Sequence, residues 1–285
     1  MRALDPEVID AVWAAVEGLI PVPSDTHPLG CHRARISDRV CFRGILIRLV
    51  TGCSWEDTER LMGGVVSDTT LRSRRDAWIA AGVFDRLAVE AIGGYDKIIG
   101  LDLSDVSVDG SQQKAPRGGT GTGRNPADRG KTGWKWSIAT ETGGIPIGWA
   151  VAPANRHDSK LVEPTLNAIA NTGLIHDIET IYLDKGYDYR FVDEHLTRAG
   201  ISDSVISRKK KRGQPEPLDQ PYRIEKRWIV ERTNSWLINF GQLRRNTDRQ
   251  TIHRLAQLTL AITLLITAKL IDWRNRWNPP TRPIR

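Results

Sequence analysis

The change of residue pattern near residue 98 constrains the fold more than any other feature of the chain. Residues 5–95 have the period of amphipathic helices that begin at Ser, Asp or Val and often end at Gly. From residue 98, runs of β-branched and aromatic residues separated by turn signals replace that period. The chain has 285 residues, 40% of them hydrophobic, which is enough to bury a sizeable core. We therefore predict an all-helical domain over residues 1–95 and an α/β domain with basic C-terminal helices over residues 96–285.

The α/β part shows a definite succession of elements. Three strand candidates come first, at residues 98–111, 134–141 and 145–153. A helix, a strand, a helix and a strand follow, at residues 158–173, 178–184, 189–200 and 202–208. With the helix that comes after them, the order is βββαβαβα, which predicts a mixed sheet with an antiparallel start and a parallel continuation. Between the first two strands, the Gly-, Arg- and Pro-rich residues 115–133 predict a mobile basic loop.

Residues 54–81 have the pattern of a helix-turn-helix. Ser54 and Ser67 are the expected N-caps, and a Gly-Gly turn at 63–64 separates the two helices. The second helix carries three arginines that we predict to contact DNA, namely Arg72, Arg74 and Arg75. The same pattern also fits a helical bundle that only packs, so both interpretations stand at this point.

The positive charge is concentrated at the C-terminal end. The net charge is +7, and residues 208–285 hold 18 Lys and Arg against 6 Asp and Glu. A polyanion is the partner that such a surface favours, and nucleic acid is the commonest one. The residues predicted to contact the DNA backbone here are Lys209, Lys210, Lys211, Arg244, Arg245 and Arg249. A basic run can also serve only as a solubilising loop.

The sequence favours a cytoplasmic, nucleoid-associated location. The N-terminus lacks the apolar core of a secretory signal, and three cysteines give no complete disulfide set, so we expect free thiols. The most apolar segment, residues 258–271, is short, threonine-rich and interrupted by Lys269, so we expect a buried helix there.

Three carboxylates stand where a sheet and a helix could bring them together. Asp109 is expected at the end of the first strand and Asp184 at the end of a later parallel strand, and ligands of α/β sheets gather at such strand ends. Glu231 lies off the apolar stripe of the amphipathic helix expected at residues 229–249. Each acid alone fits a turn or a solvated helix face. Together they could form an oxygen-ligand site for Mg²⁺ or Mn²⁺. Asp102 and Asp105 are reserve candidates on the first strand.

The chain resembles the DDE superfamily of insertion-sequence transposases, in the insertion sequence four/five group, whose catalytic core is ribonuclease H-like. The segments that carry the resemblance are "SVDGSQQKAPRGG", "WAVAPANRHDSKLVEPTL", "IYLDKGYDYR" and "IVERTNSWLINFGQLRRNTDR". It implies that Asp109 and Asp184 are the catalytic aspartates and that Glu231 is the catalytic glutamate. One branch of the family has Tyr, Arg, Glu and Lys at fixed spacing. Here Arg227 and Glu231 match, whereas Ile224 and Ile238 replace the Tyr and the Lys.

The resemblance implies a DNA transposase with two Mg²⁺ or Mn²⁺ ions about 4 Å apart. It would cut double-stranded DNA at terminal inverted repeats and join the freed 3′-hydroxyl to target DNA, acting as a homodimer or a higher oligomer. Arg227 would bind DNA phosphate beside Glu231. His157 and Lys185 are possible supporting residues close to the acids, and Asp158 or Ser159 is the expected N-cap of its helix. Two other functions stay open, a metal-dependent nuclease without strand joining and a non-catalytic DNA-binding protein.

Overall fold

The computed structural model describes residues 3–22, 35–207 and 224–277 and divides into two compact units. The first unit holds residues up to Lys97, Asn239–Leu243 and the described residues from Ala256 onward. The second holds Ile98–Ile238 and Arg244–Leu255. The chain first passes from one unit to the other between Lys97 and Ile98. Most of the last helix belongs to the first unit, and its first residues belong to the second.

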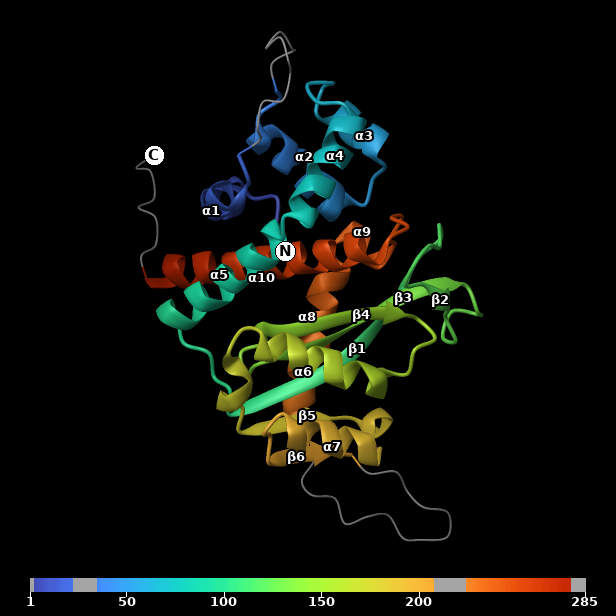
Figure 1. The fold of residues 1–285 in the computed structure, drawn as a ribbon. Coiled ribbons are helices and arrows are strands. Elements are labelled where there is room, and N and C mark those ends of the chain that lie inside the picture. The colour runs from blue at the N-terminus through green and yellow to red at the C-terminus, as the bar shows by residue number, and fades with distance from the viewer. Residues whose placement is uncertain (1–2, 23–34, 208–223, 278–285) are drawn as a thin grey trace. The chain divides into compact units, whose positions relative to one another are not determined.

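The first unit is built from the helices that the sequence predicts. They are α1 (Pro6–Val16), α2 (Asp38–Thr51), α3 (Trp55–Leu61), α4 (Asp68–Ala80) and α5 (Val83–Ile98), with the short 3-10 helix η1 (Glu17–Leu19) after α1 (Figure 1). Aromatic rings connect them in the core. Phe42 lies 5.7 Å from Trp13 and 6.3 Å from Trp78 between ring centroids, and Trp78 lies 6.4 Å from Phe84. Such large apolar side chains account for much of the free energy of burial.

The C-terminal part consists of α9 (Gly241–Arg244) and the long helix α10 (Thr251–Trp277). Helix α10 has the length and hydropathy of a membrane span, but 67% of its most apolar window is buried inside the protein. Leu258, Ile262 and Leu265 are among its buried residues, at a spacing that keeps them near one another on the helix surface. The helix is therefore a core helix, as the sequence predicts for residues 258–271.

The second unit contains one mixed sheet. Its strands are β1 (Asp105–Lys114), β2 (Gly123–Arg124), β3 (Thr132–Thr140), β4 (Pro146–Pro153), β5 (Thr180–Leu183) and β6 (Asp203–Ile206). Strands β1, β3 and β4 are antiparallel neighbours, and β1, β5 and β6 continue the sheet in parallel. The predicted fold class is confirmed in this order of elements. The short β2 was not predicted, and β1 begins later than expected because α5 extends to Ile98.

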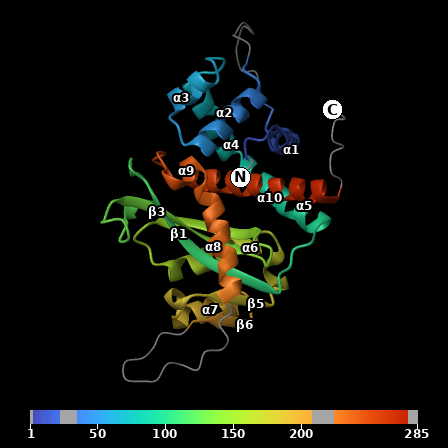
Figure 2. The ribbon, with the colours of Figure 1, turned by 180° about the vertical axis from the view of Figure 1, so that it is seen from behind.

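Helices cover both faces of this sheet (Figures 1 and 2). On one face lie α6 (Val162–Ala170) and α7 (Arg190–Arg198), with the 3-10 helices η2 (Asp158–Leu161), η3 (Leu174–Asp177) and η4 (Lys185–Tyr187). Val106 and Val108 of β1 belong to the apolar cluster on that side. Helix α8 (Ile224–Ile238) covers the other face, where Asn234 accepts a hydrogen bond from the indole Nε1 of Trp136 at 2.8 Å. Side chains alternate between faces along a strand, so Asp109 points to the α8 side.

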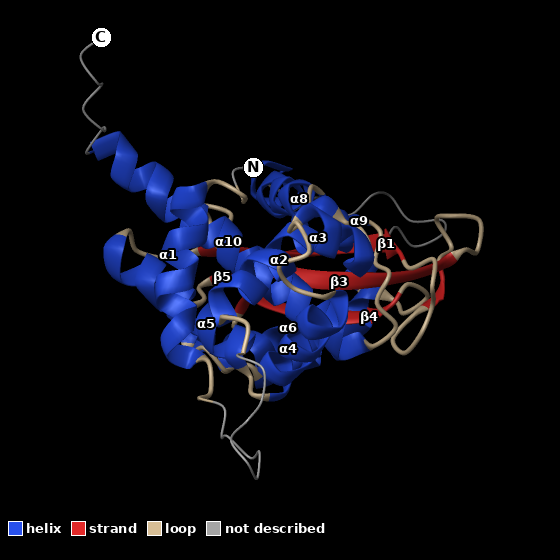
Figure 3. Ribbon diagram, turned by 90° about the horizontal axis from the view of Figure 1, so that it is seen from above, coloured by secondary structure: helices blue, strands red, loops and turns tan. Residues whose placement is uncertain are grey.

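The Gly-rich residues after β1 are held in place, contrary to the prediction of a mobile loop. Buried Arg254, which is 1% exposed, donates hydrogen bonds to the carbonyl oxygens of Gly118 and Thr120. The Thr120 N–H donates to the carbonyl of Arg249 at 2.8 Å. Figure 3 shows this loop, in tan, beyond the ends of β1 and β3, which are red. No local pattern predicts this anchor, because Arg254 lies more than a hundred residues further along the chain.

Candidate active site

Strand register places Asp109 beside Asp184. The last paired residues of the parallel β1 and β5 ladder are Ser107 and Tyr182, and each aspartate lies two residues further along its own strand direction. Asp109 also pairs with Ile138 of β3, so it lies in the middle of β1 and not at its end as predicted. The strand-end argument still holds for the parallel part of the sheet, because β5 ends at Leu183.

Helix α8 brings the third carboxylate to the same place through Arg227. The Nε atom of Arg227 lies 3.1 Å from Glu231 Oε1, and its Nη2 lies 3.6 Å from Asp184 Oδ2. Arg227 and Glu231 are one helical turn apart on α8, which accounts for their contact. The structure therefore connects the predicted Asp184 and Glu231 through one guanidinium, with Asp109 on the neighbouring strand.

Electrostatics tie Asp109 to the same group of charges. Burial raises the pKa of Asp109 to about 6, while the N–H of Gly110 and the charge of Arg227 act in the opposite direction. The negative charges of Asp184 and Asp158 add to the rise in this pKa. A carboxyl with a pKa shifted in this way is typical of functional sites, although structural charge networks produce such shifts too.

Tyr187 is a residue of the site that sequence reasoning missed. It lies in η4, three residues after Asp184, and is 1% exposed. Burial and the negative charges of Asp109, Asp158 and Asp184 raise the pKa of its phenol. Within the described residues its hydroxyl oxygen is buried without a hydrogen-bond partner. Lys185, the predicted supporting residue, is exposed in the same short helix.

A second charged pair lies close to β1 on the opposite face. The buried Lys135 of β3 donates to Asp158 Oδ1 at 2.8 Å. A Cβ atom at Gly110 would lie only 2.5 Å from the same oxygen, so a glycine next to Asp109 allows this close approach. The N-cap of η2 is His157, whose Nδ1 accepts from the N–H of Ser159 at 3.3 Å. The prediction of Asp158 or Ser159 as the cap is therefore wrong, because Asp158 is committed to Lys135.

The two reserve aspartates do not reach this site. Asp102 precedes β1 and accepts hydrogen bonds from the N–H and Oγ of Ser104, at 3.1 and 2.6 Å. Asp105 begins β1 and pairs with Thr180 at the start of β5, four residues from Asp109. Both therefore lie at the N-terminal end of β1, whereas Asp109 and Asp184 are neighbours further along the strand.

The donor set fits a hard divalent cation in its chemistry. Carboxylate oxygens are the ligands that Mg²⁺ and Mn²⁺ prefer. Across residues 3–22, 35–207 and 224–277, no three His, Cys, Asp or Glu side chains are already gathered as ligands of one ion. The guanidinium of Arg227 instead supplies the positive charge between Asp184 and Glu231. Arg227 is thus the cation that neutralises Asp184 and Glu231 in this structure.

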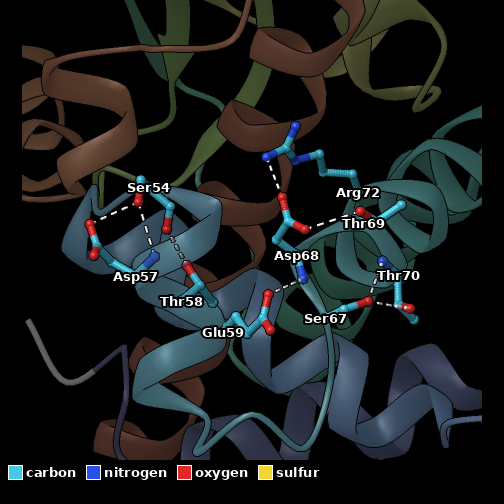
Figure 4. Close-up of polar contacts among 9 residues, drawn as sticks. All are labelled: Ser54, Asp57, Thr58, Glu59, Ser67, Asp68, Thr69, Thr70 and Arg72. Atoms are coloured by element: carbon cyan, nitrogen blue, oxygen red, sulfur yellow. Dashed lines mark hydrogen bonds and ion pairs between the residues drawn. The ribbon is translucent and has the colours of Figure 1, made fainter.

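The helix-turn-helix candidate forms as predicted, with its expected caps. Figure 4 shows the Oγ of Ser54 accepting from the N–H of Asp57 at 3.0 Å and the Oγ of Ser67 accepting from the N–H of Thr70 at 3.3 Å. Glu59 of α3 accepts from the N–H of Asp68, at 2.9 Å, and so joins the two helices. Caps of this kind each stabilise a helix by about 1 kcal/mol.

Two of the three arginines of α4 are not placed to contact DNA. Arg74 is 8% exposed and forms an ion pair with Asp38 of α2, and Arg75 is 6% exposed. The Arg75 guanidinium lies 5.0 Å from the ring centre of Trp55. These side chains pack α4 against its neighbours, contrary to the prediction. Arg72 is 47% exposed and paired with Asp68, so its role in DNA binding stays a prediction.

The arginines that follow α8 lie on the surface of the second unit. Arg244, Arg245 and Arg249 are exposed, and none of them forms an ion pair with another described residue. Their contact with DNA phosphates therefore stays a prediction. Lys209, Lys210 and Lys211 lie outside the described residues.

Comparison with known proteins finds two family matches along the chain. Residues 98–266 match the family described as "Transposase DDE domain". Residues 8–88 match the family described as "Putative transposase of IS4/5 family". The first match spans more than half of the chain, and the second spans most of the helical unit other than its C-terminal part.

Two curated relatives come from Burkholderia cepacia. The "Putative transposase for insertion sequence element IS402" is 32% identical over 149 residues, which are 50% of this chain and 67% of that protein. The "Insertion element IS402 uncharacterized 16.2 kDa protein" is 34% identical over 121 residues, 42% of this chain and 82% of that one. A pre-cleavage Mos1 transpososome structure covers 87% of this chain and 82% of its own at 10% identity. Its TM-score of 0.27 is too low to support an argument.

Proposed function

The chain belongs to the DDE transposases of the IS4/5 family, and from this premise we propose that it cuts DNA at the ends of an insertion sequence and joins the freed 3′-hydroxyl to target DNA. The observation that carries the proposal is the contact of Arg227 on α8 with both Asp184 and Glu231. Asp109 lies at the level of Asp184, on the neighbouring strand β1.

Asp109, Asp184 and Glu231 would hold two Mg²⁺ or Mn²⁺ ions. When bound, these ions would supply the Lewis acidity that activates the attacking water or 3′-hydroxyl and stabilises the leaving 3′-oxygen. The chain's own contribution is to keep the carboxylates together and negatively charged. The raised pKa of Asp109, about 6, still leaves it ionised near neutral pH.

In this proposal the side chain of Arg227 contacts the acids first and DNA phosphate later. Its side chain is 36% exposed and its acidic partners are 30% and 49% exposed, so water and phosphate can reach the contact. Once another cation neutralises the carboxylates, the guanidinium is free to turn toward DNA phosphate, for which its planar donors are suited. Arg227 would thus offset the repulsion between Asp184 and Glu231 before DNA and metal bind, and would hold the DNA backbone afterwards.

The remaining predicted contacts divide between the two units. Arg72 on α4 is the exposed arginine of the helix-turn-helix and would contact the terminal inverted repeat. Arg244, Arg245 and Arg249 would hold phosphates without regard to sequence. Because two element ends must be processed together, we propose that the active form is a homodimer or a higher oligomer on DNA.

A joint cleavage and joining assay tests the proposal. Purified protein is incubated with a labelled element end, a target plasmid and Mg²⁺, and both cut and joined products are measured. Asp109→Asn, Asp184→Asn and Glu231→Gln should each reduce both products by at least a hundredfold and leave DNA binding within about twofold, since they remove charge and little volume. Glu194→Gln, on the exposed face of α7, is the matched control and should behave as the wild type.

The outcomes separate the three candidate functions. Cutting without joining by the wild type would identify a nuclease. Binding of DNA without metal-dependent cutting, unchanged by the acid variants, would identify a non-catalytic DNA-binding protein. Full cleavage by any one acid variant would remove that residue from the site.

A further inference from the structure

Exposed cations lie beyond the end of β1, the strand that contains Asp109. Strand β3 pairs with β1 from Ser107 to Lys114 and so occupies one edge of β1 throughout. On the other edge, β5 pairs only as far as Ser107, and further along Lys114 forms an isolated parallel bridge with Arg245. The N–H of Asn246 donates to the Lys114 carbonyl at 2.8 Å, which fixes this contact. Asp184 and the segment around Arg245 therefore lie along the same edge of β1.

The cations at this place come from three stretches of the chain. They are the end of β1, the loop that follows it and the segment from the last residue of α9 onward. We name their exposed side chains the β1-end strip: Lys114, Arg117, Arg244, Arg245 and Arg249. Within the described residues none of these five forms an ion pair. The neighbouring Asp248 is only 8% exposed, so its charge is largely withdrawn from the surface. The strip thus presents uncompensated positive charge.

Hydrogen bonds from a buried arginine fix the backbone conformation of the segments that carry the strip. Arg254 donates to the carbonyls of Gly118 and Asp248 at 2.8 and 2.7 Å, and so fastens the loop to the 244–249 segment. Gly119 has a φ of 107°, and a Cβ atom there would lie 1.9 Å from the Arg249 carbonyl oxygen. Only glycine permits this approach. A solubilising loop would need no buried arginine to hold it, whereas a binding surface gains from being fixed before its ligand arrives.

We propose that the β1-end strip binds the phosphate backbone of DNA about five base pairs from the phosphate that is cut. Lys114 is five residues beyond Asp109, so their backbones lie about 17 Å apart along the strand at 3.3 Å per residue, and by alternation the Lys114 side chain leaves the other face of the sheet. A duplex that runs along β1 and passes over the end of the strand would cover that length in about five base pairs at 3.4 Å each. The proposal rests on the proposed function. It adds the loop after β1 to the DNA contacts and fixes their distance from the cut.

Phosphate-ethylation interference on a labelled element end tests the position. The full-length wild type should show two groups of phosphates where ethylation weakens binding, one at the cut and one about five base pairs away. The double variant Lys114→Gln and Arg117→Gln should lose only the distant group. Loss of that group in the control double variant Arg190→Gln and Arg198→Gln, which removes two exposed cations from α7, would overturn the proposal. The proposal would also be overturned if the strip variant kept the distant group of phosphates.

Salt titration of binding gives an independent measure. Each lost phosphate contact should reduce the slope of log affinity against log salt by about 0.9, or roughly a fivefold loss of affinity at 0.15 M relative to 1 M salt. The strip variant should therefore bind roughly 30-fold more weakly than the α7 control variant at 0.15 M salt. Equal slopes would overturn this inference alone. If the wild type binds no DNA in either experiment, the proposed function falls with it.

The variant Gly119→Ala separates shape from charge. It leaves every cation in place but forces the loop away from Arg249, so the distant ethylation signal should weaken by several-fold. Thermal unfolding of each variant confirms that the comparison is made on folded protein. An unchanged distant signal in this variant would show that the loop takes no part in the strip, and would overturn its inclusion.

Discussion

Among the contacts between cations and carboxylates in the second unit, those of Lys135 and Arg227 differ in how far water reaches them. The Lys135 side chain is 2% exposed and binds Asp158 at 2.8 Å. Arg227 is 36% exposed and lies 3.1 Å from Glu231 and 3.6 Å from Asp184. A buried pair cannot lose one partner without leaving an uncompensated charge, whereas an exposed pair contributes little and can exchange. Access to solvent, more than nearness to the acids, therefore separates residues that hold the fold from residues that can take part in chemistry.

Removal of divalent metal is expected to give the largest effect, a loss of DNA cleavage at the solvent-exposed Arg227 contact. If a metal ion replaces the charge of Arg227 at the open contact, excess EDTA should reduce cut DNA to the level of the acid variants. Added Ca²⁺ should restore binding but not cutting, because its coordination is longer and looser than that of Mg²⁺. Gel analysis of end-labelled DNA measures both. Undiminished cleavage in EDTA would show that the open contact is not a metal site.

Replacing each cation by Met should affect stability unequally. Lys135→Met leaves Asp158 without its partner beside the sheet, and because Asp158 is 37% exposed we expect the lower end of the usual cost, about 3 kcal/mol. Arg227→Met should cost less than about 1 kcal/mol, since its partners stay solvated. Urea unfolding of both variants gives the two free energies. Losses of equal size would remove the distinction between a closed and an open contact.

Asp109 should make stability depend on pH in the direction opposite to a salt-bridged acid. Burial raises its pKa from the usual value of about 4 to about 6, so the folded protein binds the proton more tightly than the unfolded chain. Its charge therefore destabilises the fold above pH 6, and this effect vanishes as the pH falls toward 4. Asp109→Asn should unfold at higher urea than the wild type at pH 8 and at the same urea near pH 4.

The measurement is urea unfolding in metal-free buffer, and Asp203→Asn at the exposed start of β6 is the control. The control should show no such difference between pH 8 and pH 4. A variant Asp109→Asn that is less stable than the wild type at pH 8 would mean that the carboxylate is held by favourable contacts and not by burial.

Helix α4 also has an exposed and a buried arginine, Arg72 and Arg74. Replacing the exposed Arg72 is expected to give the smallest effect on stability. Arg72→Gln should change the free energy of unfolding by less than about 0.5 kcal/mol, because its pair with Asp68 is at the surface. It should reduce the salt slope of DNA binding by about 1 if it contacts a phosphate. A titration on terminal-repeat DNA at several salt concentrations measures the slope. An unchanged slope would leave the helix-turn-helix with a packing role only at this position.

The order of elements was predictable from the sequence because periodicity and turn residues report it locally. Ser54 and Ser67 cap their helices as expected, and the βββαβαβα order is observed with the short β2 added after the first strand. The position of Asp109 within β1 was not predictable. The pairing of β1 with β5 ends at Ser107, before Asp109, whereas its pairing with β3 continues past Asp109 to Lys114. Asp109 is therefore at a strand end with respect to one neighbour only.

The site was predictable in its acids but not in its surroundings. Asp109, Asp184 and Glu231 carry a recognisable family pattern. The close approach of Asp158 to Gly110, the buried phenol of Tyr187 and the burial of Arg74 depend on contacts between distant segments, which no local pattern records. A glycine that directly follows Asp109 was a signal of close packing that could have pointed to the first of these.

Localised cleavage of the protein by bound Fe²⁺ tests the central claim most directly, because it maps a metal without relying on DNA chemistry. Fe²⁺ binds oxygen ligands that accept Mn²⁺, and with ascorbate and peroxide it cuts the backbone near its site. We expect cuts near residues 109, 184 and 231, suppressed by excess Mg²⁺ and absent from Asp109→Asn. Cuts confined to other segments, or cuts that persist unchanged in Asp109→Asn, would contradict the assignment of these three carboxylates as the metal site.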